Sequence, residues 1–399
     1  EREPETGKAA PTTDDSPAPA DETEQAVATV TSREALAFAI GEDGGPVQIK
    51  QGAVVLDGQT VVCAPTYRVR LDTVDSMAVT LVGPAKVRWT APPDEKPVFE
   101  VEFGRVLLEA IKPGASISIV AADQALELEF ADVESLAAMT LTHFRAPGFD
   151  PLRQENHLHT LEIYAAQGQV GLQYDENQTE LTKGQRWRQR GSEAASTSEL
   201  EEAPEWIAPA AVNEQTLESS AREALLGLMS DERPVEISLR EATMFRRSEV
   251  GSLAAQTLLA LGRSDVFFGG DGMFSKAEQR SYWSDQFTAL QSQLNRSADA
   301  AADVLEAINR MDSGNAKILF QLLTGYSPKQ LAEGGDEELV RQLDSPSMSV
   351  RVLALENLRK ITGVTLSFRP EQDNAARRGQ AIKKWEARQR KGDIRWPAP

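Results

Sequence analysis

The chain has 399 residues, which at about 100–200 residues per domain predicts two or three domains. Hydrophobic residues make up 41% and charged residues 26% of the chain, a composition typical of globular proteins and not of membrane-embedded bundles. The 42 basic and 61 acidic residues give a net charge of −19, which argues against nucleic-acid binding, because such a surface repels phosphates.

The first 33 residues have the composition of a linker. Residues 1–25 contain four prolines, eight acidic residues and two basic ones, with almost no bulky apolar side chain. Such a segment cannot bury enough apolar surface to offset the entropy of ordering it. We therefore predict a disordered acidic linker over residues 1–33. A short helix over Arg33–Ile40, with Ser32 as its N-cap, is expected to lead into the next domain.

Residues 34–190 alternate apolar and polar side chains with a period of two. Tyr67–Leu71, Val98–Phe103 and Leu126–Phe130 are examples. Such alternation is typical of half-buried antiparallel strands. Turn signals such as Gly83-Pro84 and Pro113-Gly114 separate the segments. The pattern predicts an all-β domain that forms an antiparallel β-sandwich or β-roll.

A second linker and then an all-α region are predicted after the β region. Residues 191–213 are rich in Ser, Ala, Pro and Glu, and Trp206-Ile207 is expected to pin this linker to a neighbouring domain. From residue 214 the apolar period becomes 3.6, in a stripe that starts at Leu217 behind an N-cap at Asn213. Residues 214–363 therefore predict an α-solenoid or irregular helical bundle. Further helices are expected at Ser238–Phe245, Ser252–Leu261, Ala277–Leu294, Ala298–Met311, Ala316–Leu323, Glu337–Leu343, Ser349–Ile361 and Asn374–Arg390.

Three stretches of the β region carry a resemblance. They are Met77–Trp89, which contains Gly83-Pro84; Phe99–Glu109, which contains Gly104-Arg105; and Leu161–Leu172, which is followed by Leu181–Arg186. In order, they resemble the strand–turn–strand unit, the strand–Gly-Arg–strand unit and the closing strands of the FecR-like domain of bacterial envelope proteins. The resemblance covers about residues 45–190. It implies a β domain outside the inner membrane that takes part in signalling or scaffolding.

Two stretches of the helical region resemble HEAT-like repeats. Glu338–Leu358 reads as a helix, an Asp-containing turn and a second helix that opens with Val350-Arg351, and Val235–Leu261 is a looser copy. Repeats of this kind stack helix pairs because one pair cannot bury its own apolar face. The resemblance implies a scaffold that contacts a protein partner through the helical repeats, and the number of repeats stays open.

His157 and His159 are candidate metal ligands. They lie two residues apart on a predicted strand, so their side chains would share one face and could offer two imidazoles to a metal. His143 could supply a third ligand if its strand were adjacent. The arrangement partly resembles a cupin motif, but the later histidine of that motif is missing. The alternative is that these are surface histidines on a solvated strand face, and we expect neither a metal nor a cofactor.

The sequence contains no recognisable catalytic motif. It has no Gly-x-Ser-x-Gly, no phosphate-binding glycine loop ending in Lys-Ser or Lys-Thr, and no dinucleotide-binding fingerprint. The single cysteine, Cys63, follows Val61-Val62 on a predicted strand with no histidine nearby, so we expect a buried structural thiol and no disulfide. An enzymatic activity is therefore not expected.

Residues 364–399 reverse the charge of the chain, with nine basic residues against four acidic ones. One interpretation is a basic docking face for an acidic partner, an anionic polymer or the acidic N-terminus. The other is a solvated helix whose Trp385 packs onto the last repeat. The candidate partner-binding residues are Arg377, Arg378, Lys383, Lys384 and Arg388.

These patterns favour a non-enzymatic cell-envelope protein with a FecR-like β domain and a helical protein-interaction domain. The chain begins with Glu1, so we expect a membrane anchor to precede it in a full-length precursor located in the periplasm or cell envelope. A metal-dependent, cupin-like β-roll enzyme that uses His157 and His159 is one alternative. A carbohydrate-binding protein is another, which exposed Trp89, Trp187 or Tyr174 would favour.

Overall fold

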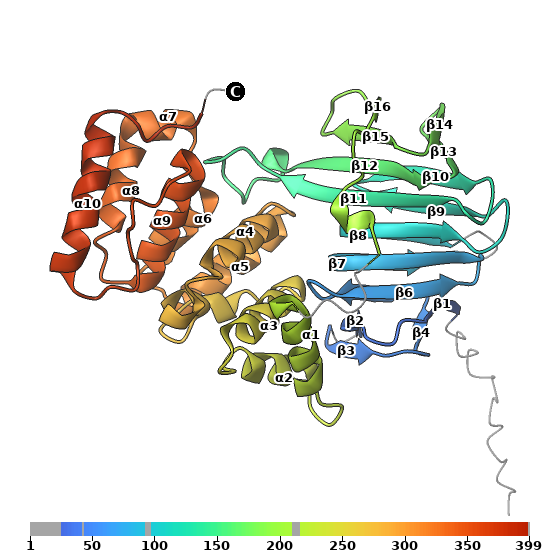
Figure 1. The fold of residues 1–399 in the computed structure, drawn as a ribbon, viewed down its shortest axis with the longest axis horizontal. Helices are drawn as coiled ribbons and strands as arrows, with labels where there is room; N and C mark the ends of the chain where they lie inside the picture. Colours follow the sequence, from blue (N-terminus) through green and yellow to red (C-terminus); the bar gives the residue numbers. More distant parts are fainter. Residues whose placement is uncertain (1–24, 42–43, 92–96, 210–215, 398–399) are drawn as a thin grey trace, which may run out of the picture.

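A β region is followed by a helical region, which confirms the predicted order of all-β and all-α folds (Figure 1). The computed structural model describes residues 25–41, 44–91, 97–209 and 216–397. The strands are β1 (Ala26–Val30), β2 (Ala37–Ile40), β3 (Pro46–Ile49), β4 (Val54–Leu56), β5 (Thr60–Cys63), β6 (Arg68–Thr73), β7 (Met77–Thr90), β8 (Val98–Ala110), β9 (Ser116–Ala121), β10 (Gln124–Phe130), β11 (Leu136–Phe144), β12 (Leu158–Gln167), β13 (Gln169–Tyr174), β14 (Asn177–Thr182), β15 (Gln185–Arg190) and β16 (Ser196–Glu199).

The strands of the described residues form one continuous hydrogen-bonded network. Its main path runs β14-β13-β10-β9-β8-β11-β12-β15-β16, and β7 connects β8 to the N-terminal strands β5 and β6. The paired strands are antiparallel except for β8 and β9, which are parallel. The alternating burial along β6 and β9 has the expected period of two, because one sheet face packs on the core.

The predicted turn at Gly83-Pro84 is wrong, because both residues lie inside the long strand β7. The register between β7 and β8 shifts between Val82 and Lys86, which allows the first half of β7 to pair with β6 and the second half with β5. A Cβ at Gly83 would overlap the Ala64 carbonyl oxygen, so this glycine permits a close backbone approach. Gly104-Arg105 likewise lies within β8.

The N-terminal predictions also need correction. Residues 26–30, assigned to the linker, form β1, which pairs with β4 and β6, while residues 1–24 of that linker lie outside the described residues. Residues 37–40, expected in a helix, form β2 between β3 and β5. Phe38 is fully buried in this strand. Pairing with distant strands outweighs a local helix preference that was weak in so short a segment.

The expected linker over residues 191–213 contains structure. Residues 196–199 form β16, which pairs with β15, and Glu205–Ile207 form a short 3-10 helix. Ile207 and Trp206 pack against Val82 and Tyr164 of the sheet, so the predicted pinning by Trp206-Ile207 is confirmed.

The helical region follows the expected pattern, except that the helix expected from Ala277 begins at Trp283, and Ala277–Gln279 form a 3-10 turn. The N-cap predicted at Asn213 lies outside the described residues, and the first helix is instead capped by the Thr216 side chain, which accepts a hydrogen bond from the Ser219 amide. The segments Val235–Leu261 and Glu338–Leu358 each fall on a pair of consecutive helices. The helices are α1 (Leu217–Leu228), α2 (Val235–Ala242), α3 (Ser248–Ala260), α4 (Trp283–Leu294), α5 (Ala298–Met311), α6 (Ala316–Thr324), α7 (Pro328–Gln330), α8 (Asp336–Gln342), α9 (Met348–Thr362) and α10 (Ala375–Arg390).

The apolar core does not divide where the secondary structure changes. One cluster contains the inner face of the sheet together with α1, α2 and part of α3, including Leu225, Leu239 and Leu258. A second cluster holds the later helices and includes Ala255 and Leu259 of α3. Helix α3 is buried on nearly all sides, as expected for a helix between two cores. Residues 216–260 therefore pack with the β region, although they were predicted to belong to a separate domain over residues 214–363.

Hydrogen bonds also connect the β region to α1. The Tyr67 hydroxyl donates a hydrogen bond to the Arg222 carbonyl oxygen at 2.7 Å, and the Arg222 guanidinium donates to the Thr66 carbonyl oxygen at 3.1 Å. The loop between β11 and β12 also reaches toward the later helices (Figure 1). In this loop, Arg145 donates a hydrogen bond to the Thr324 carbonyl oxygen at 3.2 Å. Within the described residues, no helix is both long and apolar enough to cross a bilayer.

Because the sheet and α1 share one apolar core, shortening a buried side chain of α1 should strongly lower the stability of the protein. Replacing Leu225 by Ala should lower the free energy of unfolding by about 2–5 kcal/mol, because Leu225 is fully buried and its removal leaves a cavity. Urea denaturation followed by circular dichroism measures the change. The control is Leu217→Ala in the same helix, where the side chain is 73% exposed, and its effect should stay within about 0.5 kcal/mol. Equal effects of the two substitutions would contradict the shared core.

Candidate functional site

The three histidines gather where the sheet meets the helices. His143 of β11 lies opposite His159 of β12 in the strand register, so the condition that their strands be adjacent is met. His157 lies immediately before β12 and has an extended backbone, and its charge acts on His143 as that of His159 does. Its Nδ1 lies 3.0 Å from the Asn295 carbonyl oxygen and its Nε2 lies 2.8 Å from the Pro151 carbonyl oxygen.

This geometry does not form a metal centre. Both ring nitrogens of His157 face carbonyl oxygens, so neither is directed toward a point shared with His143 and His159. In the part of the chain that the structure describes, no three His, Cys, Asp or Glu side chains are placed to hold a metal ion. His157 instead connects the strand region to the turn before α5.

Burial controls the protonation of the other two histidines. Desolvation lowers the pKa of His143 to about 4, and the nearby His159, Arg296 and His157 act in the same direction. Burial also lowers the pKa of His159, with Asp123 opposing the shift. Both imidazoles are thus neutral at pH 7. The Nδ1 of His143 and the Nε2 of His159 are buried without a hydrogen-bond partner in the described structure.

The cysteine and the aromatic side chains of the β region are core residues. Cys63 is fully buried, as predicted, and desolvation raises the pKa of its thiol to about 12, so it is a poor nucleophile. Trp89 and Trp187 are also buried, and the half-buried Tyr174 packs edge-to-face against Trp187 with ring centroids 5.0 Å apart. These three residues do not form the exposed flat face that a carbohydrate-binding function would require.

The C-terminal basic segment combines both interpretations of its sequence. Trp385 is fully buried in the core of the later helices, which confirms it as an anchor of α10. Lys383 and Lys384 directly precede this anchor and are exposed, as is Arg377 near the start of the helix. Arg388 is half-buried. The outer side of α10 therefore carries cations, while its inner side packs.

Arg378 does not belong to that exposed face. It is 7% exposed, and its guanidinium donates to the carbonyl oxygens of Gln372 at 2.7 Å and Asp373 at 2.9 Å. It also pairs with the Asp344 carboxylate at 2.9 Å. Arg378 was predicted as a partner-binding residue, but all three contacts are internal, because the side chain points from α10 toward the turn between α8 and α9.

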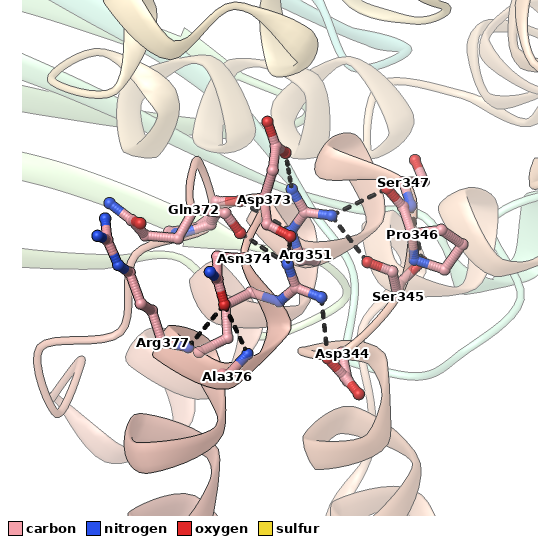
Figure 2. A network of polar contacts seen from close by, with 12 residues as sticks. Asp344, Ser345, Pro346, Ser347, Arg351, Gln372, Asp373, Asn374, Ala376 and Arg377 are labelled. Atoms are coloured by element: carbon pink, nitrogen blue, oxygen red, sulfur yellow. Dashed lines mark hydrogen bonds and ion pairs between the residues drawn. The ribbon is translucent and has the colours of Figure 1, made fainter.

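A second buried arginine completes the polar network of Figure 2. Arg351 of α9 is 2% exposed and donates to the carbonyl oxygens of Ser345, Pro346 and Pro370 at 2.8–2.9 Å. Five N–H groups in a planar fork allow one arginine to hold several carbonyls at once. The role of Arg351 was not predicted, although a single cation within the apolar run Val350–Leu355 is a signal that could have indicated it.

Together the two arginines hold three segments: the α8–α9 turn, the loop before α10, and α10 itself. Burial lowers the pKa of Arg351, and the neighbouring charge of Arg378 adds to the shift, while Asp373 and Asp344 oppose it. Two like charges are tolerated because nearly all their donors face carbonyl or carboxylate oxygens. The network positions the basic helix against the rest of the helical region.

Comparison with known proteins gives little that bears on function. No protein family matches the chain, and no curated protein matches it. Two crystal structures of a putative anti-sigma factor from Parabacteroides distasonis ATCC 8503 are similar to part of it, with 9% and 10% sequence identity and a TM-score of 0.26. The match covers 35% of this chain and 59% of the length of those chains. A likeness of this size carries no argument about fold or function.

The depressed pKa of His143 predicts a loss of stability in mild acid. Below the unfolded-state pKa of 6.5, the unfolded chain binds a proton that the folded chain does not. The free energy of unfolding should therefore fall as the pH is lowered from about 6.5 to about 4, by on the order of 2–3 kcal/mol from this group. Urea denaturation at a series of pH values measures the slope. His143→Gln should flatten it, and an unchanged slope would show that another group is responsible.

The polar network predicts a large loss of stability when one of two adjacent arginines is replaced and almost none when the other is. Arg378→Ala should lower the free energy of unfolding by on the order of 1–3 kcal/mol, because it leaves two carbonyl oxygens and Asp344 without their donor. Arg377→Ala, at the exposed neighbouring position, should change it by less than about 0.5 kcal/mol. Arg378→Lys should recover only part of the loss, because an ammonium lacks the planar fork. Thermal and urea denaturation give the values, and equal effects at 377 and 378 would exclude the structural role.

Proposed function

We propose that the protein is a non-enzymatic cell-envelope protein that acts in signalling or scaffolding. In this proposal a FecR-like β domain is held against a HEAT-like helical domain, and the helical domain binds an acidic surface of a protein partner through α10. The resemblance of three strand stretches, which include Met77–Trp89 and Phe99–Glu109, supports the first part. The periplasmic or envelope location is supported by that resemblance alone.

The exposed cations of α10 carry the second part. Among the described residues, Arg377, Lys383 and Lys384 have no carboxylate within salt-bridge distance, whereas Arg378 is consumed by the internal network. The chain as a whole has a net charge of −19, so an exposed basic helix is unusual for this surface. Such local excess of one sign steers and orients an oppositely charged partner.

The position of Arg377 strengthens this argument. It lies in the first turn of α10, where the positive end of the helix dipole disfavours a cation. The same turn contains no acidic residue that would offset the cost. Arg378 in this turn is explained by its internal contacts, but no contact within the described structure explains Arg377. Binding to an external anion would explain its placement.

Site-specific photo-crosslinking in the cells that make the full-length protein tests the partner. A photoreactive residue at Gln380, which is exposed and lies between Arg377 and Lys384 on α10, should give one discrete adduct with another protein. The control position is the equally exposed Gln178 of β14, which should give none. Lys383→Glu combined with Lys384→Glu should reduce the adduct about tenfold or more, since it reverses the charge that attracts the partner.

Two results would overturn the proposal. One is the absence of an adduct from position 380, or an adduct that persists unchanged after the charge reversal. The other concerns location: release of the full-length protein with the cytoplasmic fraction, rather than with the periplasm or envelope, would remove the envelope assignment.

A further inference from the structure

A cavity of about 480 Å³ lies where the β sheet meets the helices. Its sheet side includes Lys86, Glu102 and His143, and its helix side includes Gln293, Arg296 and Asp303. The volume falls within the range of about 300–1,000 Å³ that is usual for small-molecule sites, and such sites are frequent at domain junctions. The cavity is distinct from α10 and plays no part in the function proposed above.

Two residues that line this cavity have buried polar atoms without hydrogen-bond partners. Gln293 is only 6% exposed, and its Oε1 accepts no hydrogen bond in the described structure. The Nδ1 of His143 is also buried without a partner. A buried polar atom that is left unpaired costs about 1–3 kcal/mol, and the Gln293 amide oxygen would be satisfied by accepting from an N–H group of a bound ligand.

Most of the basic side chains that line the cavity have a salt-bridge partner. Lys86 pairs with Glu102 at 2.7 Å. Arg263, at another edge, pairs with Glu236 outside the cavity, also at 2.7 Å. These four groups neutralise one another in pairs and leave Arg296 as the cation of the cavity with no salt-bridge partner among the described residues.

The guanidinium of Arg296 is held in a position that is suited to binding an anion. Its guanidinium carbon lies 3.3 Å from the centre of the Phe103 ring, which holds the planar group in place. Burial lowers its pKa to about 9, with the charge of Glu102 opposing the shift, so it is still protonated at pH 7. A fixed guanidinium offers parallel N–H donors that match the two oxygens of a carboxylate.

The negative charges without a partner lie on the first two turns of α5. Asp299 and Asp303 are one helical turn apart, both line the cavity, and both are exposed. Neither has a basic partner within salt-bridge distance in the described part of the chain. The cavity therefore presents one unpaired cation and two unpaired carboxylates, with a buried amide oxygen that can accept from a bound N–H group.

We propose that this cavity binds a small zwitterion, namely a free amino acid or a dipeptide with both termini uncapped. The ligand carboxylate binds the Arg296 guanidinium, and the ligand ammonium binds Asp299 or Asp303, with Gln293 Oε1 accepting one of its N–H groups. A ligand with only a negative charge would be repelled by the two aspartates, and one with only a positive charge by Arg296. A bound zwitterion would also contact both the sheet and the helices and so stabilise their junction.

Ligand-observed NMR and calorimetry on the full chain test this site. The probes are L-alanine and L-alanyl-L-alanine, at concentrations up to about 10 mM, where weak sites are still detected. At least one of the two should bind saturably. The N-acetylated form, the C-terminal amide and the doubly blocked form of the dipeptide should each bind about tenfold more weakly or not at all, because each lacks one or both charges.

Substitutions distinguish this cavity from binding elsewhere. Arg296→Gln should weaken binding about tenfold or more. Because that change removes the stacking on Phe103 and could loosen the junction, Asp303→Asn is the second variant; its side chain is exposed, so folding should be unaffected, and binding should also weaken. Arg310→Gln, on the same helix but outside the cavity, is the control and should bind as the parent does.

Three outcomes would overturn the proposal: no saturable binding of either probe, equal binding of the capped and uncapped dipeptides, or binding that both cavity substitutions leave unchanged. None of these outcomes depends on α10, so the zwitterion site and the partner-binding function can fail separately.

Discussion

The apolar core that the β sheet shares with α1, α2 and one side of α3 is the constraint on which the rest of the structure depends. Leu225, Leu239 and Leu258 belong to the same buried cluster as the inner face of the sheet. Because α3 also contributes Leu259 to the core of the later helices, it joins the two clusters through one rigid element. The placement of α4 and α5 against the sheet, and with it the cavity at the junction, follows from this arrangement.

Three buried or half-buried arginines illustrate how the same side chain serves different ends. Arg351 and Arg378 donate hydrogen bonds to backbone carbonyls and to Asp344 and Asp373. These bonds hold the α8–α9 turn, the loop before α10 and α10 together. Arg296 is placed on an aromatic ring with no carboxylate at salt-bridge distance among the described residues. A cation whose donors are saturated is structural, whereas a fixed cation with free donors at a cavity is suited to an external anion.

Individual residues show where sequence reasoning succeeded and where it failed. The burial of Cys63 and Trp385 was predictable, because each stands in a locally apolar pattern whose buried face is apparent. The contacts of His157 were not predictable, since its two ring nitrogens face the carbonyl oxygens of Asn295 and Pro151, which lie far from it or in an irregular loop. Gly83 reads locally as a turn but sits inside a strand, because the close approach of Ala64 requires a residue without a side chain.

The sequence by itself determined the order of an all-β and an all-α region, most helix boundaries, and the anchoring side of α10. Each of these depends on the periodicity of a segment relative to its own backbone, which neighbouring residues reveal. Only the tertiary structure decided that β1 and β2 are strands, that α1–α3 share the core of the sheet, and that Arg378 faces inward. Those outcomes depend on contacts between residues far apart in the chain. A local sequence pattern does not specify which distant segment will pack against it.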